Sequence, residues 1–84
     1  MDKQSGYILA VDDIPNILEL IDTTLKFKGG YRVQTARNGE ESLEVIQKER
    51  PALVITDILM PKMDGFNLVH RLRLDPDTRN IPVV

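Results

Sequence analysis

The stretch Leu53–Asp57 reads LVITD, a short continuous apolar run that ends at an aspartate. Tyr7–Asp13 repeats this arrangement as YILAVDD, and Ile81–Val84, IPVV, is a third apolar run. Continuous rather than alternating apolar runs predict strands that are buried on both faces, as in a parallel sheet. Tyr31–Ala36, YRVQTA, alternates instead, which predicts an edge strand with one face in water.

Helical patterns fill the gaps between these runs. The first predicted helix has Pro15 in its first turn and ends at Gly29–Gly30. Asn38 is predicted to cap a second helix, which Pro51 stops, and a third begins near Gly65. The first helix carries one apolar stripe, formed by Ile14, Ile17, Leu18, Ile21 and Leu25. The order β-α-β-α-β-α-β predicts one α/β domain, a doubly wound parallel sheet with right-handed crossovers and helices on both faces.

Composition narrows the class of protein. The 84 residues suffice for one small domain, with 42% hydrophobic and 29% charged residues, as in ordinary soluble proteins. The net charge of -2 provides no broad basic field for nucleic acid or an anionic membrane. No apolar run is long enough to span a bilayer. The absence of cysteine excludes disulfides and thiolate metal sites, and we expect a cytoplasmic location.

Three aspartates follow predicted strands at their carboxyl ends, namely Asp12, Asp13 and Asp57. If the first and third strands are neighbours, these carboxylates lie within about 5 Å of one another. Oxygen ligands without histidine or cysteine nearby favour Mg²⁺, and such a site suits phosphoryl transfer with one carboxylate as nucleophile. The residues alone leave a second interpretation open, because an Asp-Asp pair after a strand is often only a turn and a helix cap.

The stretch Asp57–Gly65, DILMPKMDG, resembles the phosphoacceptor loop of receiver domains in the response regulators of two-component signalling. That family's pattern is Asp, two apolar residues, Met-Pro, two residues and Asp-Gly. Ile8–Asp13 resembles the family's first strand and acidic pair, Ala36–Leu43 its link from second strand to second helix, and Leu53–Thr56 its third strand. These matches stand in the family's order and cover nearly the whole chain.

The resemblance implies a flavodoxin-like receiver fold and a role for each site residue. Asp57 is expected to accept a phosphoryl group from a partner histidine kinase or phosphotransfer protein. Asp12, Asp13, Asp57 and the backbone carbonyl of Leu59 are expected to hold Mg²⁺. The chain would then be a signalling switch rather than an enzyme that acts on a separate substrate. A related phosphatase or phosphotransferase would have a second aspartate where this chain has Leu59.

Residues 1–84 resemble only the first two-thirds of a receiver domain, with strand order 2-1-3-4 and without the family's fifth strand and last two helices. The Ser or Thr and the Lys that end the family's fourth and fifth strands lie beyond Val84, and no residue here is nominated to replace the lysine. The alternative function is therefore a catalytically idle fragment that serves as an interaction or assembly module. For such a fragment we expect one of three outcomes: a homodimer through strand exchange or through the exposed sheet edge, a partner fragment that completes the sheet, or poor stability.

Overall fold

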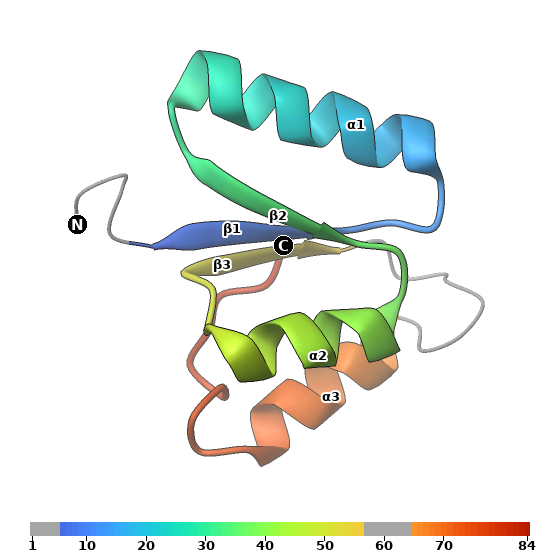
Figure 1. The fold of residues 1–84 in the computed structure, drawn as a ribbon. Coiled ribbons are helices and arrows are strands. Elements are labelled where there is room, and N and C mark those ends of the chain that lie inside the picture. Colours follow the sequence, from blue (N-terminus) through green and yellow to red (C-terminus); the bar gives the residue numbers. More distant parts are fainter. Residues whose placement is uncertain (1–5, 57–64) are drawn as a thin grey trace.

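The computed structural model describes residues 6–56 and 65–84. Three strands, β1 (Tyr7–Val11), β2 (Arg32–Ala36) and β3 (Leu53–Thr56), form a parallel sheet in the order β2-β1-β3 (Figure 1). All five residues of central β1 are buried, whereas four of the five residues of β2 are at least partly exposed. This difference confirms the central and edge strands that the two apolar patterns predict.

The fourth apolar run adds to the outer side of β3. Val83 forms a parallel bridge with Val54, whose N–H donates to the carbonyl of Pro82 at 3.0 Å. The N–H of Val84 donates to the carbonyl of Val54 at 2.9 Å. The predicted order 2-1-3-4 is confirmed, although the fourth run forms a bridge rather than a full strand.

The predicted helices are also confirmed: α1 (Pro15–Thr24), α2 (Gly39–Lys48) and α3 (Gly65–Leu74). Helix α1 covers one face of the sheet, and α2 and α3 cover the other (Figure 1). A π-helical turn, Leu25–Gly29, continues α1, and Gly30 closes it with a φ of 68°. That left-handed conformation favours glycine, which explains the Gly29–Gly30 helix end.

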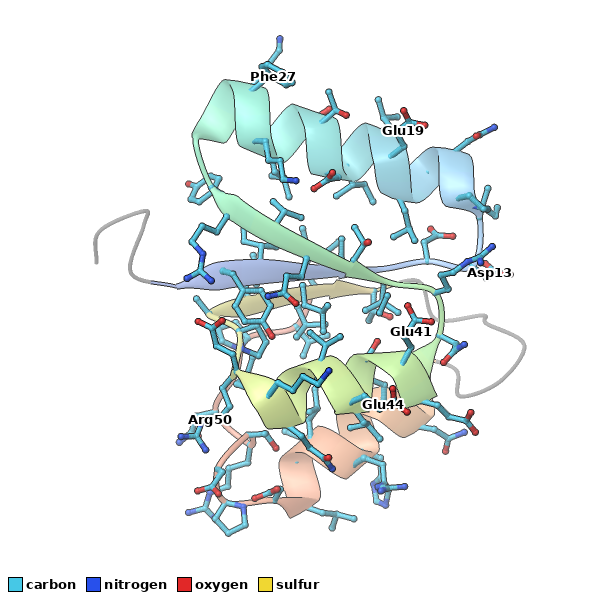
Figure 2. All side chains as sticks on the ribbon, viewed as in Figure 1. Asp13, Glu19, Phe27, Glu41, Glu44 and Arg50 are labelled. Carbon is cyan, nitrogen blue, oxygen red and sulfur yellow. The ribbon has the colours of Figure 1, made fainter. Side chains whose placement is uncertain are left out.

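The apolar stripe expected on α1 is only partly buried. Leu18 is buried, but Ile14 and Ile17 are 51% and 38% exposed. The reason is that α1 packs mainly on β1 and β2, so it shields less than the full width of the sheet. The π-helical turn, which the sequence did not reveal, leaves Phe27 86% exposed (Figure 2).

The main core lies on the face covered by α2 and α3. Alternate residues of β1 point into it, because side chains alternate across a strand. Its buried members are Tyr7, Leu9, Val11, Ala36, Ile46, Val54, Leu68, Leu72 and Ile81. This core fixes the relative positions of the strands, and therefore of the residues that follow them.

Candidate functional site at the carboxyl edge of the sheet

Asp12 directly follows β1 and is held by two backbone contacts. Its N–H donates to the carbonyl of Ala36 at 3.1 Å, which ties it to the end of β2. Its Oδ1 accepts from the N–H of Ile14 at 3.0 Å, just before α1 begins. Asp12 therefore forms the expected turn but not the expected helix cap, because the N-cap of α1 is Ile14, where no side chain forms a cap hydrogen bond. Because the bond from Ile14 uses only one carboxylate oxygen, the second oxygen makes no hydrogen bond with a residue in the described ranges.

Asp13 stands beside Asp12 and is half-buried. Figure 2 shows Asp13 at the end of the sheet where α2 begins, near Glu41, whereas Arg50 lies at the opposite end. The two aspartates thus occupy the carboxyl edge, where open parallel sheets bind ligands.

The link from β2 to α2 closes the site on one side through a reciprocal set of hydrogen bonds. Asn38 Oδ1 accepts from the N–H of Glu41 at 2.8 Å, which confirms the predicted cap. Glu41 Oε1 in turn accepts from the N–H of Arg37 at 3.3 Å, and Ser42 Oγ donates to the carbonyl of Asn38 at 2.7 Å. These bonds form a variant of the capping box, in which Glu41 reaches the residue before the N-cap, and they fix the backbone of Arg37 next to the acidic pair.

Sequence reasoning did not single out Arg37. Its side chain is exposed and makes no hydrogen bond or ion pair with the residues that the structure describes. The signal that could have found it is its position directly after β2, the strand predicted at the edge.

Two of the four predicted metal ligands, Asp57 and Leu59, lie outside the described residues. The structure brings Asp12 and Asp13 together, but within residues 6–56 and 65–84 no three acidic, histidine or cysteine side chains gather into a metal cluster. The donors that are present fit Mg²⁺ in kind, because both are carboxylates and Asp12 uses only one oxygen in hydrogen bonds with described residues. The register pairs Val11 with Thr56, the residues that precede Asp12 and Asp57 in the sequence.

At the amino end of the sheet, the polar and charged groups are paired with one another. The Tyr7 hydroxyl donates to the carbonyl of Glu49, and Arg32 Nη2 lies 3.2 Å from Glu49 Oε1. Burial of the Tyr7 phenol raises its pKa above the ordinary value of 10.0; the Glu49 carboxylate adds to this shift and Arg32 opposes it. These contacts join β1, β2 and the end of α2, so they are structural.

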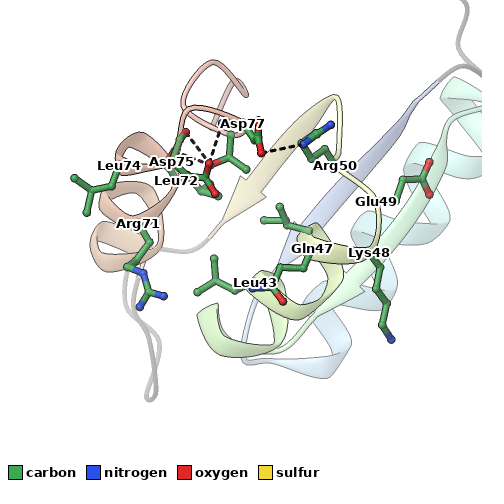
Figure 3. A pocket seen from close by; sticks show the side chains of 12 residues that line it. Leu43, Gln47, Lys48, Glu49, Arg50, Arg71, Leu72, Leu74, Asp75 and Asp77 are labelled. Atoms are coloured by element: carbon green, nitrogen blue, oxygen red, sulfur yellow. Dashed lines mark hydrogen bonds and ion pairs between the residues drawn. The ribbon is translucent and has the colours of Figure 1, made fainter.

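A groove of about 700 Å³ lies between the C-terminal halves of α2 and α3 (Figure 3). Leu43, Ile46 and Leu72 give it apolar walls. At its margin, Arg50 Nη1 lies 3.6 Å from Asp77 Oδ2. This groove faces the amino end of the sheet and is separate from the acidic pair. Across the part of the chain that the structure describes, no helix has the length and hydropathy needed to cross a membrane.

Comparison with known proteins agrees with this arrangement. The family model described as the response regulator receiver domain matches residues 8–84. The chain is 43% identical over 84 residues to the "Probable transcriptional regulator ycf27" of Pyropia yezoensis, and this match covers 100% of the chain and 33% of that relative. The chain therefore spans about a third of the length of this curated relative.

Two solved structures are also similar. The N-terminal domain of a response regulator receiver protein from Methanoculleus marisnigri JR1 has a TM-score of 0.87 and 47% identity, covering 94% of this chain and 63% of that one. Response regulator TrrA of Thermotoga maritima, in complex with Mg²⁺-BeF, has a TM-score of 0.79 and 40% identity, covering 86% and 62%. The fold of this chain is thus an incomplete form of the fold in these structures.

Proposed function

Because this chain belongs to the response regulator receiver domain family, we propose that it takes a phosphoryl group onto Asp57 from the phosphohistidine of a histidine kinase or phosphotransfer protein. A carboxylate oxygen of Asp57 forms a bond to phosphorus, the phosphorus–nitrogen bond breaks, and the imidazole leaves. The chemistry takes place on the chain itself, so we propose a switch rather than an enzyme for a separate substrate. A cytoplasmic location agrees with this role.

The register of β1 and β3 carries this proposal. Val11 pairs with Thr56, so the acidic pair follows one strand of a neighbouring pair and Asp57 follows the other in sequence. Asp12 and Asp13 would supply oxygens to Mg²⁺ together with Asp57 and the Leu59 carbonyl; the cation, when bound, neutralises charge on the phosphoryl oxygens. The solved relative in complex with Mg²⁺-BeF supports the same choice of ion.

The proposal also covers nucleic acid and a second copy of the chain. Because the net charge of the chain is -2, we propose that this segment does not bind nucleic acid. Within the described residues, Val83 is bridged to Val54 on one side only, so this edge of the sheet has an open side on which a second copy could pair. Sedimentation at several protein concentrations tests this homodimer, and a constant monomer mass would contradict it.

Intact-mass spectrometry of the chain with Mg²⁺ and acetyl phosphate tests the central proposal. In that reaction the bond from phosphorus to the acetyl oxygen breaks and acetate leaves. We expect a Mg²⁺-dependent gain of one phosphoryl group, and its complete loss in Asp57→Asn. If the parent gains no mass, the phosphoacceptor proposal for this chain fails and the interaction module takes its place.

A further inference from the structure

Arg37 is fixed beside the acidic pair by the sheet itself. The register pairs Val11 with Ala36, and the N–H of Asp12 donates to the Ala36 carbonyl at 3.1 Å. Arg37 is the next residue, and its own N–H is held by Glu41 Oε1 at 3.3 Å. The backbone of Arg37 is therefore held one strand spacing away from that of Asp12, which is about 4.8 Å in a parallel sheet.

The charges at this edge are unequal. Residues 12–16, 37–41 and 65–67 are the described residues that follow the strands or begin the helices, and they contain four carboxylates but one cation, Arg37. Its guanidinium is exposed and forms no ion pair with a described residue. Arg32, at the other end of β2, is instead paired with Glu49. An arginine side chain is longer than one strand spacing, so the Arg37 guanidinium can reach over the acidic pair.

Building on the proposed function, we propose that Arg37 tunes the acidic pocket through its charge, opposing the Mg²⁺ ion and attracting the anionic phosphoryl donor. Both effects follow from Coulomb's law at short range, and they have opposite signs for the two ligands. The guanidinium raises the dissociation constant of Mg²⁺ because like charges repel. It speeds the approach of a phosphate-bearing donor because opposite charges attract.

The experiment compares Arg37→Ala with Arg71→Ala. Arg71 is an exposed α3 residue beside the groove at the amino end (Figure 3), so its removal changes the net charge equally but far from the acidic pair. Calorimetry gives the dissociation constant of Mg²⁺. The initial rate of mass gain with acetyl phosphate at saturating Mg²⁺ gives the second readout.

In Arg37→Ala we expect Mg²⁺ to bind about two- to fivefold more tightly and the rate to fall about two- to fivefold, both at low salt. Both changes shrink as salt is raised, because the charges are exposed to solvent. Arg37→Lys retains the charge and behaves like the parent, whereas Arg37→Glu shifts both readouts further in the same directions. Thermal unfolding shows that each variant is folded.

Three results overturn the proposal. If Arg37→Ala equals Arg71→Ala in both readouts while the parent is phosphorylated, Arg37 is an ordinary surface residue and the phosphoacceptor proposal stands. If Mg²⁺ affinity and rate fall together with the unfolding temperature, Arg37 acts through the capping box instead. If the parent neither binds Mg²⁺ nor gains a phosphoryl group, both proposals fail.

Discussion

At the amino end of the sheet, Arg32 begins β2 and is paired twice with Glu49, at 3.2 and 3.4 Å. At the carboxyl end, Arg37 follows the same strand and has no ion pair among the described residues. The charged residues at the two ends of β2 therefore differ in their contacts. Paired charges at the amino end hold elements together. At the carboxyl end, no ion pair joins the charged side chains that the structure describes, and this is the end at which parallel sheets bind ligands.

The largest expected effect tests the carboxyl end. Asp13→Asn removes a full charge from the acidic pair, and we expect Mg²⁺ affinity to fall at least about tenfold because a contacting carboxylate is lost. The free energy of unfolding should change by less than about 1 kcal/mol, since the half-buried side chain lies in the core of neither face. Calorimetry with Mg²⁺ and urea unfolding measure the two quantities.

A matched substitution at the other end sharpens that result. Glu49→Gln also removes one carboxylate, but its Mg²⁺ affinity should equal that of the parent. If Asp13→Asn leaves Mg²⁺ affinity unchanged, the distinction between the two ends is lost and the metal site is assigned wrongly.

A smaller effect is expected at the amino end from Tyr7→Phe. The hydroxyl that donates to the Glu49 carbonyl is lost, which should lower the free energy of unfolding by about 1 kcal/mol without altering Mg²⁺ affinity. Urea unfolding at neutral pH measures the loss. A change in Mg²⁺ affinity as large as the change in stability would show that the two ends are coupled.

The same residue predicts a pH dependence. The folded chain raises the pKa of Tyr7 above 10.0, mainly through burial, so the protonated form is favoured in the folded state. The contribution of the Tyr7 hydroxyl to the free energy of unfolding is fully present below pH 10. It is lost as the pH rises through the pKa of the folded state, because the unfolded chain releases the proton first. Parent and Tyr7→Phe unfolding curves should therefore converge above pH 10. Parallel curves would contradict the raised pKa.

The sequence predicted most of this fold because its strongest signals are local. Buried β1 appears as a continuous apolar run, and Asn38, Pro15 and Gly30 mark helix ends whose chemistry depends on few neighbours. The burial of α1 could not be predicted in the same way. Ile14 and Ile17 belong to a regular stripe, but their exposure depends on which strands α1 covers.

In the candidate site, too, the residues with a local sequence signal were predicted and those that depend on distant contacts were not. Asp12 and Asp13 were predicted because they interrupt an apolar run, and the structure places both directly after β1 at the carboxyl edge. The roles of Asp57 and Leu59 remain predictions from the family resemblance. Arg37 was missed because its significance depends on the pairing of Val11 with Ala36, a contact between residues far apart in sequence.

The smallest expected effect concerns Arg32, which begins β2, and Arg37, which follows it. Arg32→Ala removes an exposed ion pair and a cation 6.0 Å from the Tyr7 ring, and we expect a loss of about 0.2 to 1 kcal/mol. This loss should shrink with added salt, because both charged side chains are about half exposed. Arg37→Ala is the comparison variant and should show a smaller salt-dependent loss, since Arg37 has no direct ion pair to lose within the described residues. Urea unfolding of both variants at low and high salt measures the difference. Equal losses would mean that Arg37 is as structural as Arg32, and the contrast between the two ends of the sheet would then rest on the aspartates alone.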